Sequence, residues 1–148
     1  MKERVGEHGQ RRLRVFVLGC EALSLAVRGD RKMIARLDLA ARGEAEVVTS
    51  PMALVEAYDG RTTEQRWDWV LSRLQVVGIG KDEARRARRL LTDAELHGHK
   101  YAVDAVLAAI ARQQKGRVTV HLGRRRPGRA GRVRCDGSWL PVGRCGRW

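Results

Sequence analysis

The sequence predicts an α/β fold in which a mostly parallel sheet is covered by helices. Short apolar segments recur along the chain, amphipathic segments of about ten or more residues separate them, and Gly or Asp residues mark many of the boundaries. The chain has 148 residues, of which 43% are hydrophobic. This length allows one domain with a buried core and no second domain.

The expected strands are the short segments rich in β-branched residues, and they span residues 13–18, 46–49, 76–79 and 117–120. The segments between them place apolar residues at helical spacing, and Asp30 and the pair Ser50-Pro51 are helix-start signals. The expected helices span residues 21–27, 31–42, 51–57, 63–74, 81–96 and 101–114, with residues 97–99 as a loop. A site is expected at the carboxyl ends of the strands, as is typical of parallel sheets.

Two flanking segments differ from this core. Residues 1–12 are polar and basic, and we expect a loose arm. Apolar periodicity ends at His121, and residues 121–148 contain eight Arg, six Gly and one Asp. Because glycine raises the entropic cost of ordering a chain, we expect this tail to be disordered and to form no regular element of the domain. The predicted domain therefore spans residues 13–120.

The net charge of +13 favours a polyanionic partner such as RNA. However, 25 of the 30 basic residues are Arg, a bias that a GC-rich genome also produces. No apolar run reaches about 18 residues and no export signal is visible, so we expect no membrane segment and a cytoplasmic location. Cys20, Cys135 and Cys145 show neither a disulfide pattern nor zinc-ligand spacing, which predicts reduced thiols.

Glu56 and Asp104 are the acids most suited to chemistry, because each lies in a predicted helix among apolar neighbours. A carboxylate surrounded by core-facing residues needs compensation, and a divalent cation provides it. Taken singly, each is better interpreted as an exposed helix carboxylate, and Asp104 also as an acid favoured by the helix dipole. Their order and context together favour a shared role.

The segments RVFVLGCEALSLAV, MALVEAY and VDAVLAAIARQQKGRVTV, taken in this order, resemble those of PIN domains over residues 13–120. The resemblance implies a three-layer α/β/α fold and a metal-dependent endoribonuclease of the VapC-like toxin class. It also implies Mg²⁺ or Mn²⁺ as cofactor, with Glu56 and Asp104 as catalytic metal ligands. RNA, a cognate antitoxin and a second copy of the chain are the implied partners.

The sequence departs from the PIN pattern at two of the four acidic positions. Gly19 stands where the first Asp is expected, and the basic run Arg124-Arg125-Arg126 follows where the last acidic segment is expected. Glu21 is a possible third metal ligand if the first strand continues past Gly19, because alternate strand residues point the same way. The arginines would instead bind nucleic acid.

The genetic code permits an explanation of the second departure. Suitable codons for His121 through Gly128 encode Thr-Ser-Asp-Glu-Asp-Asp-Leu when read one nucleotide later, which is the acidic closing segment of the family. The tail is therefore a possible frameshift product. We expect an endoribonuclease impaired in catalysis. The alternatives are a non-catalytic, basic nucleic-acid-binding protein, or a domain retained for dimerisation or for titrating an antitoxin.

Overall fold

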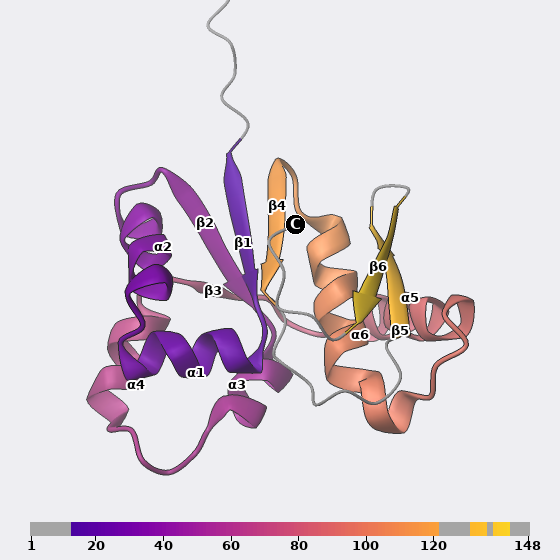
Figure 1. Cartoon of the computed structure of the whole chain (residues 1–148), viewed down its shortest axis with the longest axis horizontal. Helices are drawn as coiled ribbons and strands as arrows, with labels where there is room; N and C mark the ends of the chain where they lie inside the picture. Colours follow the sequence, from indigo (N-terminus) through magenta and orange to yellow (C-terminus); the bar gives the residue numbers. More distant parts are fainter. Residues whose placement is uncertain (1–12, 122–130, 136–137, 143–148) are drawn as a thin grey trace, which may run out of the picture.

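A four-stranded parallel sheet forms the centre of the molecule in the computed structural model, which describes residues 13–121, 131–135 and 138–142 (Figure 1). The strands are β1 (Arg14–Leu18), β2 (Ala45–Thr49), β3 (Gln75–Val76) and β4 (Arg117–His121). Their spatial order is β3-β2-β1-β4, so β1 is paired on both sides. The predicted third strand, 76–79, is wrong in extent, since only two residues pair with β2.

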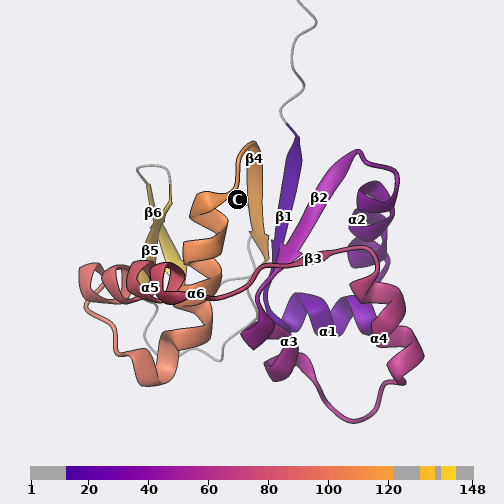
Figure 2. The same ribbon diagram turned by 180° about the vertical axis from the view of Figure 1, so that it is seen from behind.

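Six helices cover the two faces of the sheet, and together they confirm the predicted three-layer α/β/α architecture. They are α1 (Cys20–Arg28), α2 (Arg31–Ala41), α3 (Pro51–Ala57), α4 (Glu64–Leu71), α5 (Lys81–Asp93) and α6 (Gly98–Gln113). Both ribbon views place α1 to α4 on one side of the central strands and α5 with α6 on the other (Figures 1 and 2). This is a PIN-like fold.

The alternation of side chains along β1 divides the core into two parts. Val15 and Val17 pack with α5 and α6, where Leu107 and Ile110 are almost completely buried. Leu18 packs on the other face with α1 to α4. Successive strand residues point to opposite faces, so a strand covered on both sides is apolar throughout, as β1 and β2 largely are.

Helix starts follow the sequence signals closely. The Asp30 carboxylate accepts hydrogen bonds from the backbone N–H groups of Lys32 and Met33 at 3.0 and 3.1 Å. The Ser50 hydroxyl accepts one from Ala53 N–H at 3.0 Å, with Pro51 as the first helical residue. The expected loop at 97–99 is wrong, because His97 is the N-cap residue of α6 and Gly98 begins the helix.

The C-terminal segment differs from the expectation that it forms no regular element. Residues Gly131–Cys135 (β5) and Ser138–Val142 (β6) pair as a two-stranded antiparallel sheet, separate from the central sheet. The sequence between these strands is Asp136-Gly137, a pair that strongly favours two-residue hairpins and that our sequence analysis did not use. Residues 1–12, the predicted N-terminal arm, lie outside the described residues.

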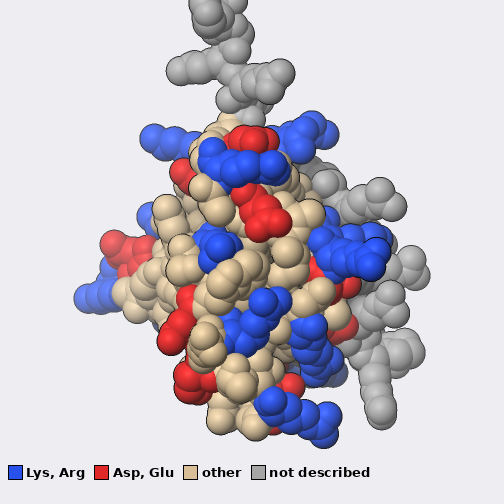
Figure 3. Space-filling model, turned by 90° about the vertical axis from the view of Figure 1, so that its left-hand side faces the viewer, with Lys and Arg blue, Asp and Glu red and all other residues tan. Residues whose placement is uncertain are grey.

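Charged side chains of both signs lie on one side of the molecule. The side that carries α2 and α4 shows Lys and Arg interspersed with Asp and Glu (Figure 3). Within the part of the chain that the structure describes, no helix has the length and apolar character needed to cross a membrane.

Substituting Ile110→Ala should lower the free energy of unfolding by about 2–5 kcal/mol, because the side chain is fully buried between α6 and the sheet. Val55→Ala is the matched control, since 78% of Val55 is exposed, and it should change stability by less than about 0.5 kcal/mol. Urea unfolding followed by circular dichroism measures both. Equal effects of the two substitutions would contradict the assignment of this core.

Candidate active site at the carboxyl end of the sheet

The carboxyl ends of β1, β2 and β4 lie at one edge of the sheet, because all the strands are parallel and in register (Figure 1). Gly19 follows β1 directly, and its backbone N–H donates to the carbonyl oxygen of His121 at 2.8 Å. Gly19 is buried and has an extended backbone as the N-cap residue of α1. It therefore lies beside the end of β4, in the position that the sequence predicted for it.

The end of β2 is locked against the end of β1. The Thr49 hydroxyl donates to the carbonyl oxygen of Leu18 at 2.7 Å, and Thr49 and Ser50 have no exposed surface. Because Ser50 also caps α3, the hydrogen bonds of these two residues determine where α3 begins relative to β1. Glu56 lies in the last turn of this seven-residue helix.

Cys20, the first residue of α1, lies close to both predicted acidic ligands. The Glu56 carboxylate lies near enough to this thiol to influence its pKa. Burial first, then the Glu56 carboxylate and to the smallest extent the negative charge of Asp104, together raise the pKa of the Cys20 thiol to about 11. The structure therefore brings the carboxylates of an exposed α3 residue and a half-buried α6 residue to the same thiol at the end of β1.

Glu21 does not gain support as a third ligand. The alternation argument required the first strand to continue past Gly19, but α1 begins at Cys20, so Glu21 lies in the first helical turn. Among the described residues, no three His, Cys, Asp or Glu side chains converge closely enough to hold a metal ion. The donor set that is present therefore does not fit Mg²⁺, which requires several converging oxygen ligands.

Cys20 was not predicted as a site residue from the sequence, which indicated only a reduced thiol. The available signal was its position, because Cys20 follows the end of a predicted strand at the edge where a site is expected. Arg124, Arg125 and Arg126, the predicted nucleic-acid-binding residues, lie outside the described residues.

His121 ends β4 and is buried, with 5% of its surface exposed. The ring centroids of His121 and Phe16 are 6.1 Å apart. The Arg36 guanidinium lies over the Phe16 ring, 5.4 Å from its centroid. The Nε2 atom is buried and has no hydrogen-bond partner in the described structure. Burial, and secondarily the positive charge of Arg36, lower the pKa of His121 to about 4.

Comparison with known proteins supports the fold assignment. No family model and no curated protein matches the chain. Among solved structures, the chain is similar to one from the crystal structure of VapBC2 from Rickettsia felis bound to a DNA fragment from their promoter. The TM-score is 0.53 at 19% sequence identity, over 66% of this chain and 80% of that chain. The similarity supports the architecture shared by both chains.

The neighbourhood of Cys20 can be tested by its reactivity. In a Cys135→Ser, Cys145→Ser background, Glu56→Gln should lower the pKa of Cys20, because it removes a negative charge and a carboxylate hydrogen-bond acceptor. Iodoacetamide should then alkylate Cys20 faster at pH 8–9, since the thiolate is the nucleophile. Asp104→Asn should act in the same direction and more weakly.

The rate of alkylation as a function of pH measures this effect by mass spectrometry. Glu44→Gln, which removes an exposed carboxylate that pairs with Arg42, is the control and should leave the profile unchanged. Identical profiles for all variants would show that Glu56 and Asp104 do not share the neighbourhood of Cys20.

Folding stability should depend on pH through His121. The pKa of His121 is lowered from 6.5 to about 4 in the folded chain, so below about pH 6.5 the unfolded chain binds a proton more readily than the folded chain. The full stability is therefore present above about pH 6.5 and is lost as the pH falls toward 4. The loss by pH 4 should be on the order of 2–3 kcal/mol. Urea unfolding at pH 7.0, 5.5 and 4.5 measures it.

His121→Gln removes the titrating group. The comparison uses the change of unfolding free energy with pH, so it holds even if the variant is less stable at neutral pH. Its unfolding free energy should fall less than that of the unmodified chain between pH 6.5 and 4.5. The carboxyl pKa values of Asp59 and Glu83 are lowered by hydrogen bonds to backbone N–H groups, so these residues titrate mainly at lower pH. If His121→Gln and the unmodified chain showed the same pH dependence of stability, the assignment of His121 as a buried, neutral histidine would be wrong.

Proposed function

We propose that this chain derives from a PIN-type, metal-dependent endoribonuclease of the toxin class and that catalysis is impaired in this copy. The observation that supports the proposal is the position of Cys20 directly after the end of β1, where the carboxylates of Glu56 and Asp104 both raise the pKa of its thiol. This supports the proposal that the two acidic residues expected from the resemblance act near Gly19, which stands where the family pattern has its first Asp.

The missing carboxylate explains the proposed impairment. Mg²⁺ and Mn²⁺ prefer several oxygen ligands, and metal-assisted phosphodiester cleavage depends on holding the ion. Gly19 supplies no side-chain oxygen beside Glu56 and Asp104. A thiol with a pKa of about 11 stays protonated at neutral pH, so Cys20 is a poor substitute for a carboxylate.

His121 supports the proposed frame slip. Burying a polar group without a hydrogen-bond partner is unfavourable, and His121 is the first residue of the segment whose composition changes. In the shifted reading its position holds Thr, the start of the acidic closing segment. Since Gly19 N–H bonds the His121 carbonyl, the acids of that segment would follow β4 on the side of the sheet edge where Gly19 lies.

A non-catalytic nucleic-acid-binding role is the second candidate, favoured by the net charge of +13. In the unmodified chain the two roles lead to the same behaviour, which is RNA binding without cleavage. The proposed RNA-binding residues Arg124, Arg125 and Arg126 follow β4 in the sequence. The proposed protein partners are a cognate antitoxin and a second copy of the chain, by resemblance to the VapC-like class.

Four proteins test the proposal: the unmodified chain, Gly19→Asp, a chain with residues 121–127 replaced by Thr-Ser-Asp-Glu-Asp-Asp-Leu, and the combination of both changes. The combination should cleave RNA with Mn²⁺ and not with a chelator. Each single repair should recover less than the combination, because ligands of one ion act as a unit and their effects are not additive. Cleavage of a labelled RNA measures the rates.

Calorimetric titration with Mn²⁺ provides a readout that does not depend on cleavage, and affinity should rise with each repair. Glu56→Gln in the doubly repaired protein is the control and should abolish the gain. Cleavage by the unmodified chain at the rate of the double repair would show that other residues form the site. No cleavage and no Mn²⁺ binding by the double repair would overturn the proposed descent.

A further inference from the structure

The outer face of α5 carries a row of basic side chains, which we call the α5 stripe: Lys81, Arg85, Arg88 and Arg89. At about 100° per residue these positions fall within an arc of roughly 100° on the helix. The buried residues Ala87 and Leu90 lie on the opposite side, packed toward α6 and the sheet. All four side chains of the stripe are exposed.

The two acids in the first turn of α5, Asp82 and Glu83, do not neutralise this face. The Glu83 carboxylate accepts a hydrogen bond from the backbone N–H of Gly80 at 2.9 Å and forms a salt bridge with Arg86 at 3.7 Å. Glu83 and Arg86 both lie outside the stripe. Asp82 reaches Arg85 at 3.8 Å, but 73% of its side chain is exposed, so the pair contributes little. Within the described residues, Arg88 and Arg89 take part in no salt bridge through their side chains.

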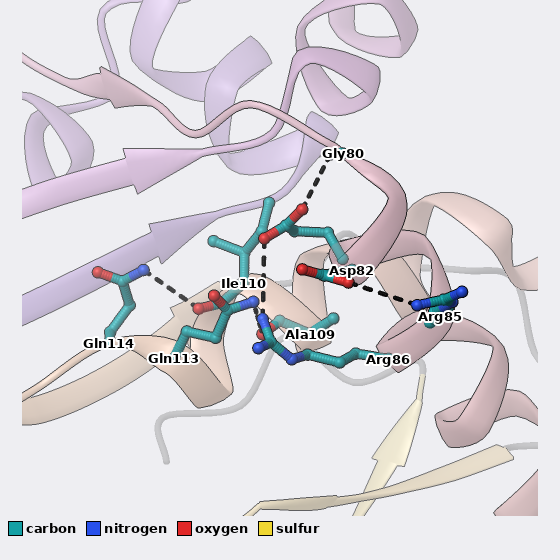
Figure 4. Close-up of polar contacts among 9 residues, drawn as sticks. Gly80, Asp82, Arg85, Arg86, Ala109, Ile110, Gln113 and Gln114 are labelled. Atoms are coloured by element: carbon teal, nitrogen blue, oxygen red, sulfur yellow. Dashed lines mark hydrogen bonds and ion pairs between the residues drawn. The ribbon is translucent and has the colours of Figure 1, made fainter.

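The neighbouring helix explains why the stripe points outward. Figure 4 shows Arg86 directed toward Ala109 and Gln113 of α6, whereas Arg85 extends in a different direction. In the view from behind, α5 lies in front of α6, so its far side is open to solvent (Figure 2). The side-chain amides of Gln113 and Gln114 donate hydrogen bonds to carbonyl oxygens of α6, at 3.3 and 3.1 Å.

We propose that the α5 stripe is a docking surface for the phosphate backbone of RNA. Successive charges lie roughly 6 Å apart along the helix axis from Lys81 to Arg85 and from Arg85 to Arg89, which suits a linear polyanion. Guanidinium groups bind phosphate oxygens in bidentate geometry. The stripe contains no aromatic or large apolar side chain that could form the core of a protein–protein interface, and this favours RNA over an acidic protein.

The stripe lies on α5, whereas Glu56 and Asp104 lie on α3 and α6, and its basic side chains would bind phosphate without metal. The choice of RNA as the polyanion rests on the function proposed above. The binding assay is therefore run on the full unmodified chain in the presence of chelator, where cleavage plays no part. Failure to restore cleavage would then contradict the proposed function, whereas failure of the binding test would contradict only the role of the α5 stripe.

The experiment compares Arg88→Gln/Arg89→Gln with the control Arg31→Gln/Arg61→Gln. Both double variants lose two exposed charges that form no salt bridge in the described structure, and the control pair lies on α2 and in the loop before α4. Fluorescence anisotropy with a labelled single-stranded RNA of mixed sequence measures the dissociation constant from 50 to 400 mM salt. Circular dichroism checks that the variants remain folded.

The stripe variant should reduce the salt slope of binding by about 1.4, since each lost phosphate contact on a single strand accounts for about 0.7. This corresponds to affinity weakened on the order of 25-fold at 0.1 M salt. Arg88→Lys/Arg89→Lys should restore most of the slope, because it restores both charges. The control should retain the slope of the unmodified chain.

Equal losses in the stripe and control variants would overturn the proposal, because they would show that only net charge matters. An unchanged slope in the stripe variant would overturn it as well. Competition with polyglutamate identifies the occupant. If polyglutamate displaced RNA at equal charge concentration, and if its own binding depended on Arg88 and Arg89 to the same extent, the stripe would be an acidic-protein surface instead.

Discussion

The double pairing of β1 is the constraint on which the rest of this structure depends. With β2 on one side and β4 on the other, both in parallel register, the ends of three strands are held at one edge. The bonds from Gly19 N–H to His121 and from Thr49 to Leu18 close that edge. Every element that carries a candidate site residue begins at or packs against it, so the site geometry follows from strand pairing.

The edge carries negative charge from two carboxylates, but the described residues there do not form a group of three metal ligands. The carboxylates of Glu56 and Asp104 both raise the pKa of Cys20, so both negative charges act on the thiol that follows β1. A bound cation would need such a field, but also a further oxygen ligand that Gly19 does not provide. Gly19 suits this position of the fold, because a buried glycine with an extended backbone meets the requirements of a strand end and a helix cap.

The two basic features of the molecule have different physical origins. The α5 stripe results from a helix whose opposite side is buried, so its charges are held in a row by the packing of Ala87 and Leu90. The eight arginines of residues 121–148 belong to a segment that begins at a buried histidine without a partner for Nε2. Core packing holds the basic residues of α5 on one exposed side of the helix, and the proposed phosphate-binding surface rests on that arrangement.

The sequence by itself determined the local elements and the architecture. Apolar periodicity identified four strands and six helices, and Asp30 and Ser50 marked helix starts that the structure confirms. The shortened β3, the helix start at Gly98 and the β5–β6 pairing were not predicted, because pairing depends on neighbours distant in sequence and the Asp136-Gly137 signal was overlooked. Only the tertiary structure brought Cys20 beside Glu56 and Asp104 and buried His121. Both results require α3, α6 and β4 to meet β1, and such contacts are set by the packing of the whole sheet rather than by any local pattern.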